Sequence, residues 1–183
     1  MSPSFDRVLL LVDGYNIIGH WSELKISRDR YGLETARYQL IESLINYTAA
    51  MAYQTKIVFD AHYQNTPGTE EKHTALLSVQ YTGFAETADT YIEKFCAAFS
   101  NNKYQYNCSR LIVATSDRAQ QLTVVGYGAE WRSAQMLAGE VATATRQTRQ
   151  KKQTKKKPSG RLLFYALDPA SQKRLRQWQR GVR

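Results

Sequence analysis

The sequence predicts an α/β fold in which a central parallel sheet is flanked by helices in three layers. Short apolar, β-rich runs alternate along the chain with segments of helical spacing. Several of the runs are apolar almost throughout, which is typical of strands covered on both faces. Strands that alternate with helices favour parallel pairing through right-handed crossovers, so helices are expected on both sides of the sheet.

Five runs are candidate strands. "RVLLLV" begins at Arg7, "KIVF" at Lys56, "LLSVQY" at Leu76 and "RLIVAT" at Arg110, while the weaker "LTVVGY" begins at Leu122. The runs at Arg7, Lys56 and Arg110 are the ones that are apolar almost throughout. They are therefore expected in the middle of the sheet.

Three segments between or after these runs predict helices. In residues 32–54 the apolar side chains recur at intervals of three and four, and the same spacing appears in residues 88–99 and 133–144. Each would place one apolar face against the sheet.

The charge of the chain is divided sharply along its length. The net charge is +9. Residues 1–145, the body, hold 12 Lys and Arg and 15 Asp and Glu, so the body is mildly acidic. Residues 146–183, the basic arm, hold 13 Lys and Arg and a single acid, Asp168. We therefore expect a domain over 1–145, a basic linker over 146–160 and a basic strand and helix segment over 161–183. The linker fits either a solvated helix extension or a flexible connection. A basic arm beside an acidic body indicates a polyanionic partner.

Several classes of protein are disfavoured by composition. No apolar run approaches the length of a membrane span, so no membrane partner is expected. The first residues are too short for a leader peptide. Cys96 and Cys108 form neither a metal-ligand pair nor a disulfide framework. A cytoplasmic protein with reduced cysteines is the expectation.

Acidic residues follow three of the predicted strands. Asp13, Asp60 and Asp117 stand at or just after strand ends. Glu86 and Asp89 stand at the start of the helix that follows "LLSVQY". In open α/β sheets the carboxyl ends of the strands form the ligand-binding edge. The five carboxylates are therefore expected at one edge. Glu86 and Asp89 would share a helix face, unless Thr87 caps the helix and leaves Glu86 just outside it.

Each acid alone also fits a structural role, because Asp is common in turns and at helix starts. As a set they are harder to explain that way, since converging carboxylates repel one another unless a cation or a shared proton compensates. Oxygen ligands point to Mg²⁺ or Mn²⁺ rather than zinc. Such an ion would activate water and neutralise charge that builds on a phosphate.

Two polar residues accompany the acids. Asn16 would hydrogen-bond an acidic ligand or a phosphate, or it would only stabilise a tight turn formed by "DG" and the nearby Gly19. Ser116 would orient a carboxylate or a water molecule, or it would only satisfy the strand end. The sequence leaves both pairs of alternatives open.

Five sequence blocks then carry a family resemblance. "LLLVDGYNIIGHW", "IVFDAHY", "AETADTYIEKF", "LIVATSDRAQQLTVVGYGAEWRSAQML" and "LDPASQKRLRQWQRG" occur in this order from Val8 to about Gly181. Together they resemble the YacP-like branch of the NYN domains, which belong to the PIN-like nuclease group. The resemblance implies divalent-metal-dependent endonucleolytic cleavage of RNA and, for bacterial members, an association with ribosomes.

The resemblance also implies roles for individual residues. Asp13, Asp89 and Asp117 match the metal-holding acids of the group, with Asn16 and Glu86 beside them in the catalytic set. Ser116, Asp60 and His62 are expected near the substrate. Asp60 and His62 lie in the "FDAH" block, and Asp60 is a less constant part of the general PIN-like site.

The basic arm and several aromatic residues are candidate RNA contacts. The lysines of "KKQTKKK" would neutralise phosphates and make binding salt-dependent, namely Lys151, Lys152, Lys155, Lys156 and Lys157. Five aromatics near the presumed strand ends would stack on unpaired bases or, as most such residues do, pack in the interior: Tyr15, Trp21, Tyr63, Tyr127 and Trp131.

The sequence therefore predicts an endoribonuclease that uses Mg²⁺ or Mn²⁺, with mRNA on the ribosome as the candidate setting. An alternative is a non-catalytic factor that binds RNA or the ribosome. A metal-dependent phosphatase for small molecules is a third, but such substrates would gain little from the basic arm.

Overall fold

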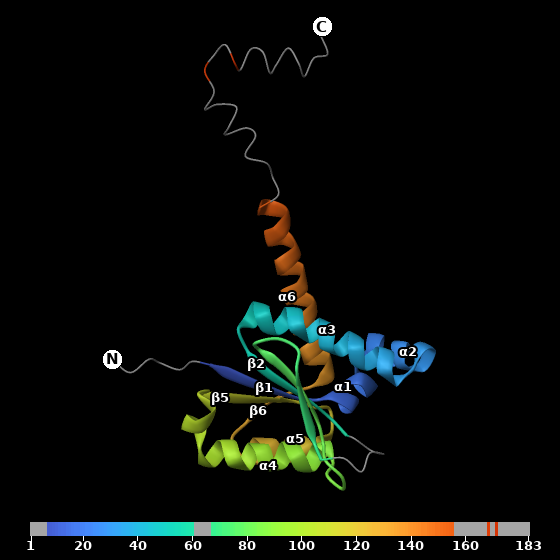
Figure 1. Ribbon diagram of the computed structural model, residues 1–183, viewed down its shortest axis with the longest axis vertical. Coiled ribbons are helices and arrows are strands. Elements are labelled where there is room, and N and C mark those ends of the chain that lie inside the picture. Colours follow the sequence, from blue (N-terminus) through green and yellow to red (C-terminus); the bar gives the residue numbers. More distant parts are fainter. Residues whose placement is uncertain (1–6, 61–66, 156–167, 169–170, 172–183) are drawn as a thin grey trace, which may run out of the picture. The chain divides into compact units, whose positions relative to one another are not determined.

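The computed structural model of the 183-residue chain describes residues 7–60, 67–155, 168 and 171 (Figure 1). The chain divides into two compact units, residues 1–145 and 146–183. The first unit holds the sheet and the helices packed on it. The division into domain, linker and terminal segment stays a prediction.

A six-stranded sheet forms the centre of the first unit. The strands lie in the order β3-β4-β2-β1-β5-β6, and every neighbouring pair is parallel except β3 with β4. The mostly parallel sheet confirms the expected fold class, with an antiparallel strand at one edge as the exception. The bounds are β1 Val8–Asp13, β2 Gln54–Phe59, β3 Thr69–Lys72, β4 Leu77–Tyr81, β5 Arg110–Ala114 and β6 Glu130–Arg132.

Helices cover both faces of this sheet (Figure 1). Side chains alternate along a strand, so Leu10 and Val12 of β1 enter one core while Leu9 and Leu11 enter the other. The first core is completed by α1, α2, α3 and the start of α6, and the second by α4 and α5. The bounds are α1 Gly14–His20, α2 Ser22–Tyr31, α3 Leu33–Met51, α4 Ala88–Asn101, the 3₁₀ helix η1 Lys103–Tyr106, α5 Arg118–Gly126 and α6 Ala134–Lys155.

A buried polar contact ties α6 to α3. The Tyr47 hydroxyl donates to Glu140 Oε2 at 2.6 Å, and Arg132 Nε of β6 donates to Glu140 Oε1 at 3.2 Å. Because Tyr47 is buried, its hydroxyl needs such a partner. The first turns of α6 are thereby fixed over the sheet.

The predicted strand at "LTVVGY" is wrong, because residues 122–126 belong to α5 and Tyr127 is its C-cap. Asp117 caps this helix by accepting from the Gln120 backbone N–H at 2.9 Å. Val124 points into the core, whereas Leu122 is 72% exposed and Val125 is 55% exposed. A run of β-favouring residues has thus become helical because its cap and its single buried position outweigh local propensity.

The predicted tight turn at "DGYN" is also wrong, because a helix begins there. Asp13 is the N-cap of α1 and accepts from the Asn16 backbone N–H at 3.2 Å. Gly14 is required for a different reason: a Cβ at this position would overlap the Phe59 ring of β2. The short elements α1, α2, β3 and β6 carry too little periodicity to be predicted.

The basic region continues α6 beyond the first unit. Residues 146–155 are helical, in agreement with the helix-extension alternative for the first part of the 146–160 segment. The remaining residues, 156–160, lie outside the described part. Further on, Asp168 Oδ2 accepts from the Ser171 backbone N–H at 3.2 Å, which is the contact that an aspartate makes when it caps a helix start.

Two expectations from composition are tested by the described residues. Cys96 and Cys108 are free thiols, as predicted, and both are buried. Of the helices in the described ranges, none is both long enough and apolar enough to cross a membrane.

Substituting Gly14 tests the close approach of α1 to β2. We expect Gly14→Ala to lower the free energy of unfolding by about 2 kcal/mol, because the new methyl group must displace the Phe59 ring. The measurement is urea unfolding followed by circular dichroism. Gly19→Ala is the matched control in the same helix, since its Cβ would come no closer than 3.9 Å to Arg28 and should be neutral or mildly stabilising. Equal stability of the two variants would contradict the prediction.

Candidate functional site

Acidic side chains gather where the parallel strands end. Asp13 is the last residue of β1, Asp60 follows β2, and Asp117 follows β5 by three residues. Asp89 lies in the first turn of α4. In the register of the sheet Asp13 pairs with Val58 and Val12 pairs with Ala114, so the three strands end side by side. The connection after β1 runs toward β2 and the connection after β5 runs toward β6, in opposite directions along the sheet, and such a switch point opens a crevice for ligands.

Asp13 is the most perturbed carboxyl group of this edge. Its side chain is only 6% exposed, and burial raises its pKa to about 7. The hydrogen bond from the Asn16 backbone opposes this effect, and the charges of Asp89, Asp60 and Asp117 add to it. These four carboxylates are therefore close enough to repel one another. Asp60 belongs to this acidic set as fully as the other three.

Asn16 links the ends of two strands. Its side-chain Oδ1 accepts from the Ser116 backbone N–H at 2.7 Å, across 100 residues of sequence. Ser116 Oγ in turn accepts from the Ala134 N–H at 3.0 Å, at the start of α6. The side-chain amide of Asn16 thus joins the chain that follows β1 to the chain that follows β5, at the switch point between these strands. The hydroxyl of Ser116 satisfies the start of a neighbouring helix, which favours the structural alternative for this residue.

Gln120 is a site residue that sequence reasoning missed. Its side-chain Nε2 donates to Asp89 Oδ1 at 2.6 Å, while its backbone N–H donates to Asp117 Oδ1 at 2.9 Å. The residue is buried, and among the described residues its Oε1 finds no hydrogen-bond partner. One glutamine therefore connects two of the acids. The available signal was its position three residues after an N-cap aspartate, on the first turn that faces the edge.

Glu86 takes the second of its two expected placements, and Asp60 follows β2 as expected. Thr87 caps α4, so Glu86 lies outside the helix and does not share a face with Asp89. Glu86 Oε1 pairs with Lys94 Nζ at 2.8 Å. Asp60 Oδ1 accepts from the Ala88 N–H at the start of α4, which draws this helix to the end of β2.

The remaining candidates are only partly covered by the structure. His62, Tyr63, Lys156 and Lys157 lie outside the described residues, and Lys151, Lys152 and Lys155 lie on α6, where the Lys151 side chain is exposed. Their proposed contacts with RNA stay predictions.

The aromatics near the strand ends mostly pack. Tyr15 lies against Phe59 at a ring-centroid distance of 4.9 Å, and Trp21 is buried. Trp131 Nε1 donates to the Thr115 carbonyl at 2.7 Å. Tyr127 is the exposed member of the group that the structure describes.

The donor set suits a hydrated divalent cation. In the described ranges, no three or more His, Cys, Asp or Glu side chains are placed so that all would hold one ion directly. Mg²⁺ typically takes one or two carboxylates and keeps several of its waters, and other carboxylates then accept from those waters. The buried Asp13 carboxyl group, the three acids around it and Gln120 Oε1, which lacks a hydrogen-bond partner among the described residues, fit that arrangement.

The mostly parallel sheet, the two helical layers and the acidic switch point match the arrangement that the resemblance implies for a PIN-like domain. More narrowly, the chain belongs to the YacP-like NYN domain family, whose model matches residues 10–180.

Known relatives agree with this assignment. The chain is 38% identical over 176 residues to a Bacillus subtilis protein described as uncharacterized protein YacP, covering 94% of this chain and 97% of that one. It is also similar to two crystal structures of Rae1 (YacP) from Bacillus subtilis. One has a TM-score of 0.63 at 34% identity, covering 94% and 95% of the two chains. The other, a tryptophan-to-leucine mutant, has a TM-score of 0.64 at 32% identity, covering 91% and 96%.

The raised pKa of Asp13 predicts how stability depends on pH. In metal-free protein the native state holds this proton up to about pH 7, whereas the unfolded chain releases it near pH 4. The native state therefore binds more protons in that window, so the free energy of unfolding falls as pH rises through it. Asp13→Asn keeps a capping side chain but has no charge to desolvate. We expect it to be about 2 kcal/mol more stable than the wild type at pH 8, with the difference vanishing near pH 4.

The measurement is urea unfolding in EDTA across that pH range. Asp29→Asn, on the exposed side of α2, is the control and should show no such pH-dependent gap. A wild type as stable as Asp13→Asn at pH 8 would rule out the buried charge.

Replacing Gln120 tests its hold on Asp89. Gln120→Leu has similar volume but removes the donor at 2.6 Å, so the carboxylate form of Asp89 loses stabilisation. The pKa of Asp89 is already raised by partial burial and by Asp117 and Asp60, and we expect it to rise further in the variant. Side-chain carboxyl NMR in metal-free protein measures it. Gln121→Leu is the control, and a Gln120→Leu shift no larger than that control would disprove the contact.

Proposed function

We propose that this protein is a divalent-metal-dependent endoribonuclease that cleaves phosphodiester bonds of RNA. The proposal rests chiefly on the buried Asp13 carboxyl group, whose pKa is raised to about 7 by burial and by three neighbouring acids. A cation beside Asp13 would offset both its desolvation and the mutual repulsion of the acids. Membership of a nuclease family supports the same activity.

Asp13, Asp89 and Asp117 are the residues proposed to hold Mg²⁺ or Mn²⁺, in part through water. When bound, such an ion supplies Lewis acidity, a more acidic water molecule and compensation of charge on the phosphate. Asp60 adds negative potential from the neighbouring strand end while it anchors α4 through the Ala88 N–H. The protein's own task is to keep these carboxylates in fixed relative positions before the ion and the RNA arrive.

Two amide side chains keep the acids in place. Asn16 fixes the start of α1 to the end of β5, so the Asp13 and Asp117 backbones cannot separate. Gln120 holds the Asp89 carboxylate from α5. Glu86, paired with Lys94, is proposed to act on substrate or water only if RNA displaces that partner.

RNA attraction is proposed to come from the basic residues of 146–183. The acidic edge repels a polyanion in the absence of metal, whereas the segment carries 13 basic residues against one acid. Phosphate neutralisation by such residues makes affinity fall steeply with salt. We propose mRNA on the ribosome as the substrate setting, since the resemblance to bacterial family members suggests it.

A non-catalytic RNA- or ribosome-binding factor is the competing function. The basic segment would serve that function equally well. The acidic edge would not, because a buried carboxyl group among three other acids opposes folding at neutral pH and brings an adaptor no benefit. The edge therefore favours the nuclease. A phosphatase for small molecules would use the edge but not the basic segment.

The test is cleavage of labelled RNA by the full chain with Mn²⁺ or Mg²⁺, with and without ribosomes that carry mRNA. We expect Asp13→Asn, Asp89→Asn and Asp117→Asn each to lower the cleavage rate at least about 100-fold, since each removes a charge from the cation site. Asp29→Asn should cleave like the wild type. Circular dichroism confirms that each variant is folded.

Metal titration adds a readout that does not depend on turnover. Mn²⁺ should raise the melting temperature of the wild type and of Asp29→Asn but have little effect on Asp13→Asn. RNA binding without cleavage under every condition, with no stabilisation by metal, would refute the nuclease and leave the binding factor.

A further inference from the structure

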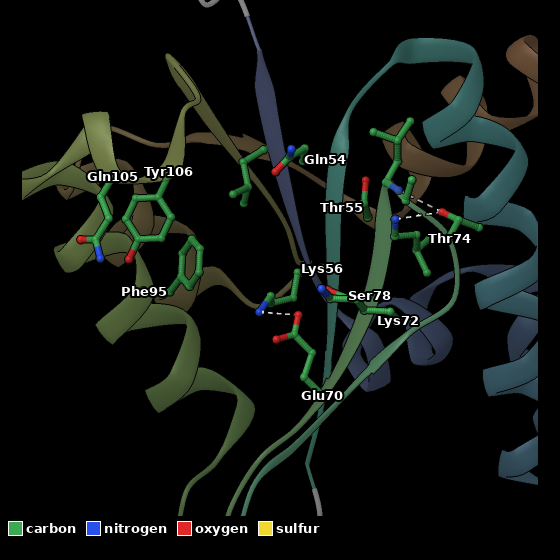
Figure 2. Close-up of a pocket in the computed structure, with 14 residues that line it drawn as sticks. Gln54, Thr55, Lys56, Glu70, Lys72, Thr74, Ser78, Phe95, Gln105 and Tyr106 are labelled. Carbon is green, nitrogen blue, oxygen red and sulfur yellow. Dashed lines mark hydrogen bonds and ion pairs between the residues drawn. The ribbon is translucent and has the colours of Figure 1, made fainter.

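A groove of about 470 Å³ lies away from the acidic edge, near the amino ends of the central strands. Its floor includes Lys56 of β2 and Ser78 of β4, and one wall is formed by Phe95 of α4 and Tyr106 of η1 (Figure 2). Glu70 of β3 lies opposite that wall. The volume is within the usual range of small-ligand sites.

The groove exists because a helix layer stops short. On this face the core formed with α4 takes residues from β1, β2 and β5, among them Leu9, Leu11 and Val58. The part of the face over β4 and β3 carries polar side chains instead, including Ser78 and Glu70. A parallel sheet normally covers both faces with apolar contacts, so an uncovered polar floor needs a separate explanation.

Aromatic rings line one side of the groove and continue along α4. Tyr91 and Phe95 are stacked with ring centroids 6.3 Å apart and an interplanar angle of 29°. The ring centroids of Phe95 and Tyr106 lie 5.1 Å apart. All three rings are only partly buried. Successive partly exposed rings are the usual stacking platform for unpaired bases.

The floor presents a donor and an acceptor side by side. Lys56 Nζ lies 3.0 Å from Glu70 Oε1, and the dashed line in Figure 2 marks this pair. Hydrogen bonds from Lys56 and Ser78 hold the pKa of Glu70 below its usual value, so the group is a carboxylate at neutral pH. The ammonium can donate to a carbonyl oxygen, and the carboxylate can accept from two adjacent N–H groups.

We propose that this groove binds the guanine base of an unpaired RNA nucleotide. The Watson–Crick edge of guanine presents one carbonyl acceptor next to two N–H donors, which complements Lys56 beside Glu70. Adenine presents an acceptor at the position where guanine has its ring N–H and would leave the carboxylate facing a lone pair. The face of the base would lie against the Phe95 ring, and the Tyr106 ring, tilted by 49° from it, would flank the base.

The groove also lies within reach of the acidic edge along a single helix. Asp89 and Phe95 are six residues apart on α4, which is about 9 Å of helix rise. Tyr91 lies between them. A strand of RNA that has its guanine in the groove could therefore follow α4 to the acids. In this form the inference rests on the proposed function, since it assigns a base preference to the same RNA.

The test is an NMR titration of the full chain in EDTA with the trinucleotides UGU and UAU and with free GMP. We expect UGU to shift the backbone amide signals of Ser78, Phe95 and Tyr106 and to bind at least about tenfold more tightly than UAU. UGU should also bind more tightly than GMP, because flanking nucleotides add phosphate and stacking contacts.

Two variants and one matched control make the result specific. Glu70→Gln removes the acceptor and Lys56→Met removes the donor while keeping its apolar stem, and each should abolish the preference for UGU over UAU. Glu71→Gln makes the same charge change one residue along β3, where side chains point to the opposite face and Glu71 lies 3.8 Å from His73. It should keep the preference. Circular dichroism verifies folding in each case.

The outcomes separate this inference from the nuclease proposal, because no metal is present and no cleavage is needed. Equal binding of UGU and UAU, or shifts that avoid the groove, would overturn the guanine site even if the protein cleaves RNA. GMP binding as tightly as UGU would assign the groove to a free nucleotide and overturn the RNA assignment. A preference that Glu70→Gln and Lys56→Met abolish would support the site even if no cleavage is found.

Discussion

The buried carboxyl group of Asp13 is the constraint around which the rest of the first unit is organised. It terminates the central strand, caps the first helix and lies among three other acids, so its environment opposes its own charge. Nearby features relieve this conflict only in part: the Asn16 backbone donates one hydrogen bond, while Asn16 and Gln120 hold the neighbouring chain ends and the Asp89 carboxylate. The polypeptide leaves the negative charge of these acids partly uncompensated, and a bound cation would compensate it. This requirement for a cation connects the fold to the proposed chemistry.

The parallel register converts distant positions in the sequence into one site. Because β1 lies between β2 and β5 in parallel register, the ends of these strands coincide. Asp13 ends β1, and Asp60 and Asp117 follow β2 and β5. The helices contribute less obvious parts. α4 brings Asp89 because its first N–H groups are bound by Thr87 and Asp60, and α5 brings Gln120 because Asp117 starts it. Capping residues and site residues are thus largely the same residues, so the site is as rigid as the helix starts that form it.

Much of the fold and of the acidic edge was predictable from the sequence, for reasons that differ between elements. Strong sequence signals mark the strands β1, β2, β4 and β5 and the helices α3 and α4. Buried strands appear as short apolar runs, whereas a helix buried on one face appears as apolar residues at intervals of three and four. The acids could be assigned to one edge because chain topology alone brings strand ends together. The helical state of "LTVVGY" could not be predicted, since local propensity favoured a strand and only the Asp117 cap and the burial of Val124 decide otherwise. The Gln120–Asp89 and Asn16–Ser116 bonds join side chains to groups 31 and 100 residues away, and a single sequence does not specify such contacts.

The two outermost strands have a consequence of their own. An open sheet exposes unpaired N–H and C=O groups at each margin, and these are templates for pairing with further chains. Here β3 is four residues long with every side chain exposed and the sequence "TEEK", while β6 is three residues long and carries Glu130 and Arg132, with Glu130 in an ion pair with Arg110 of β5. Short, charged margins leave little length for an added strand and make its approach electrostatically unfavourable. The charged side chains of β3, which also line the groove, therefore help to protect the strongly apolar sheet from pairing with further chains and aggregating.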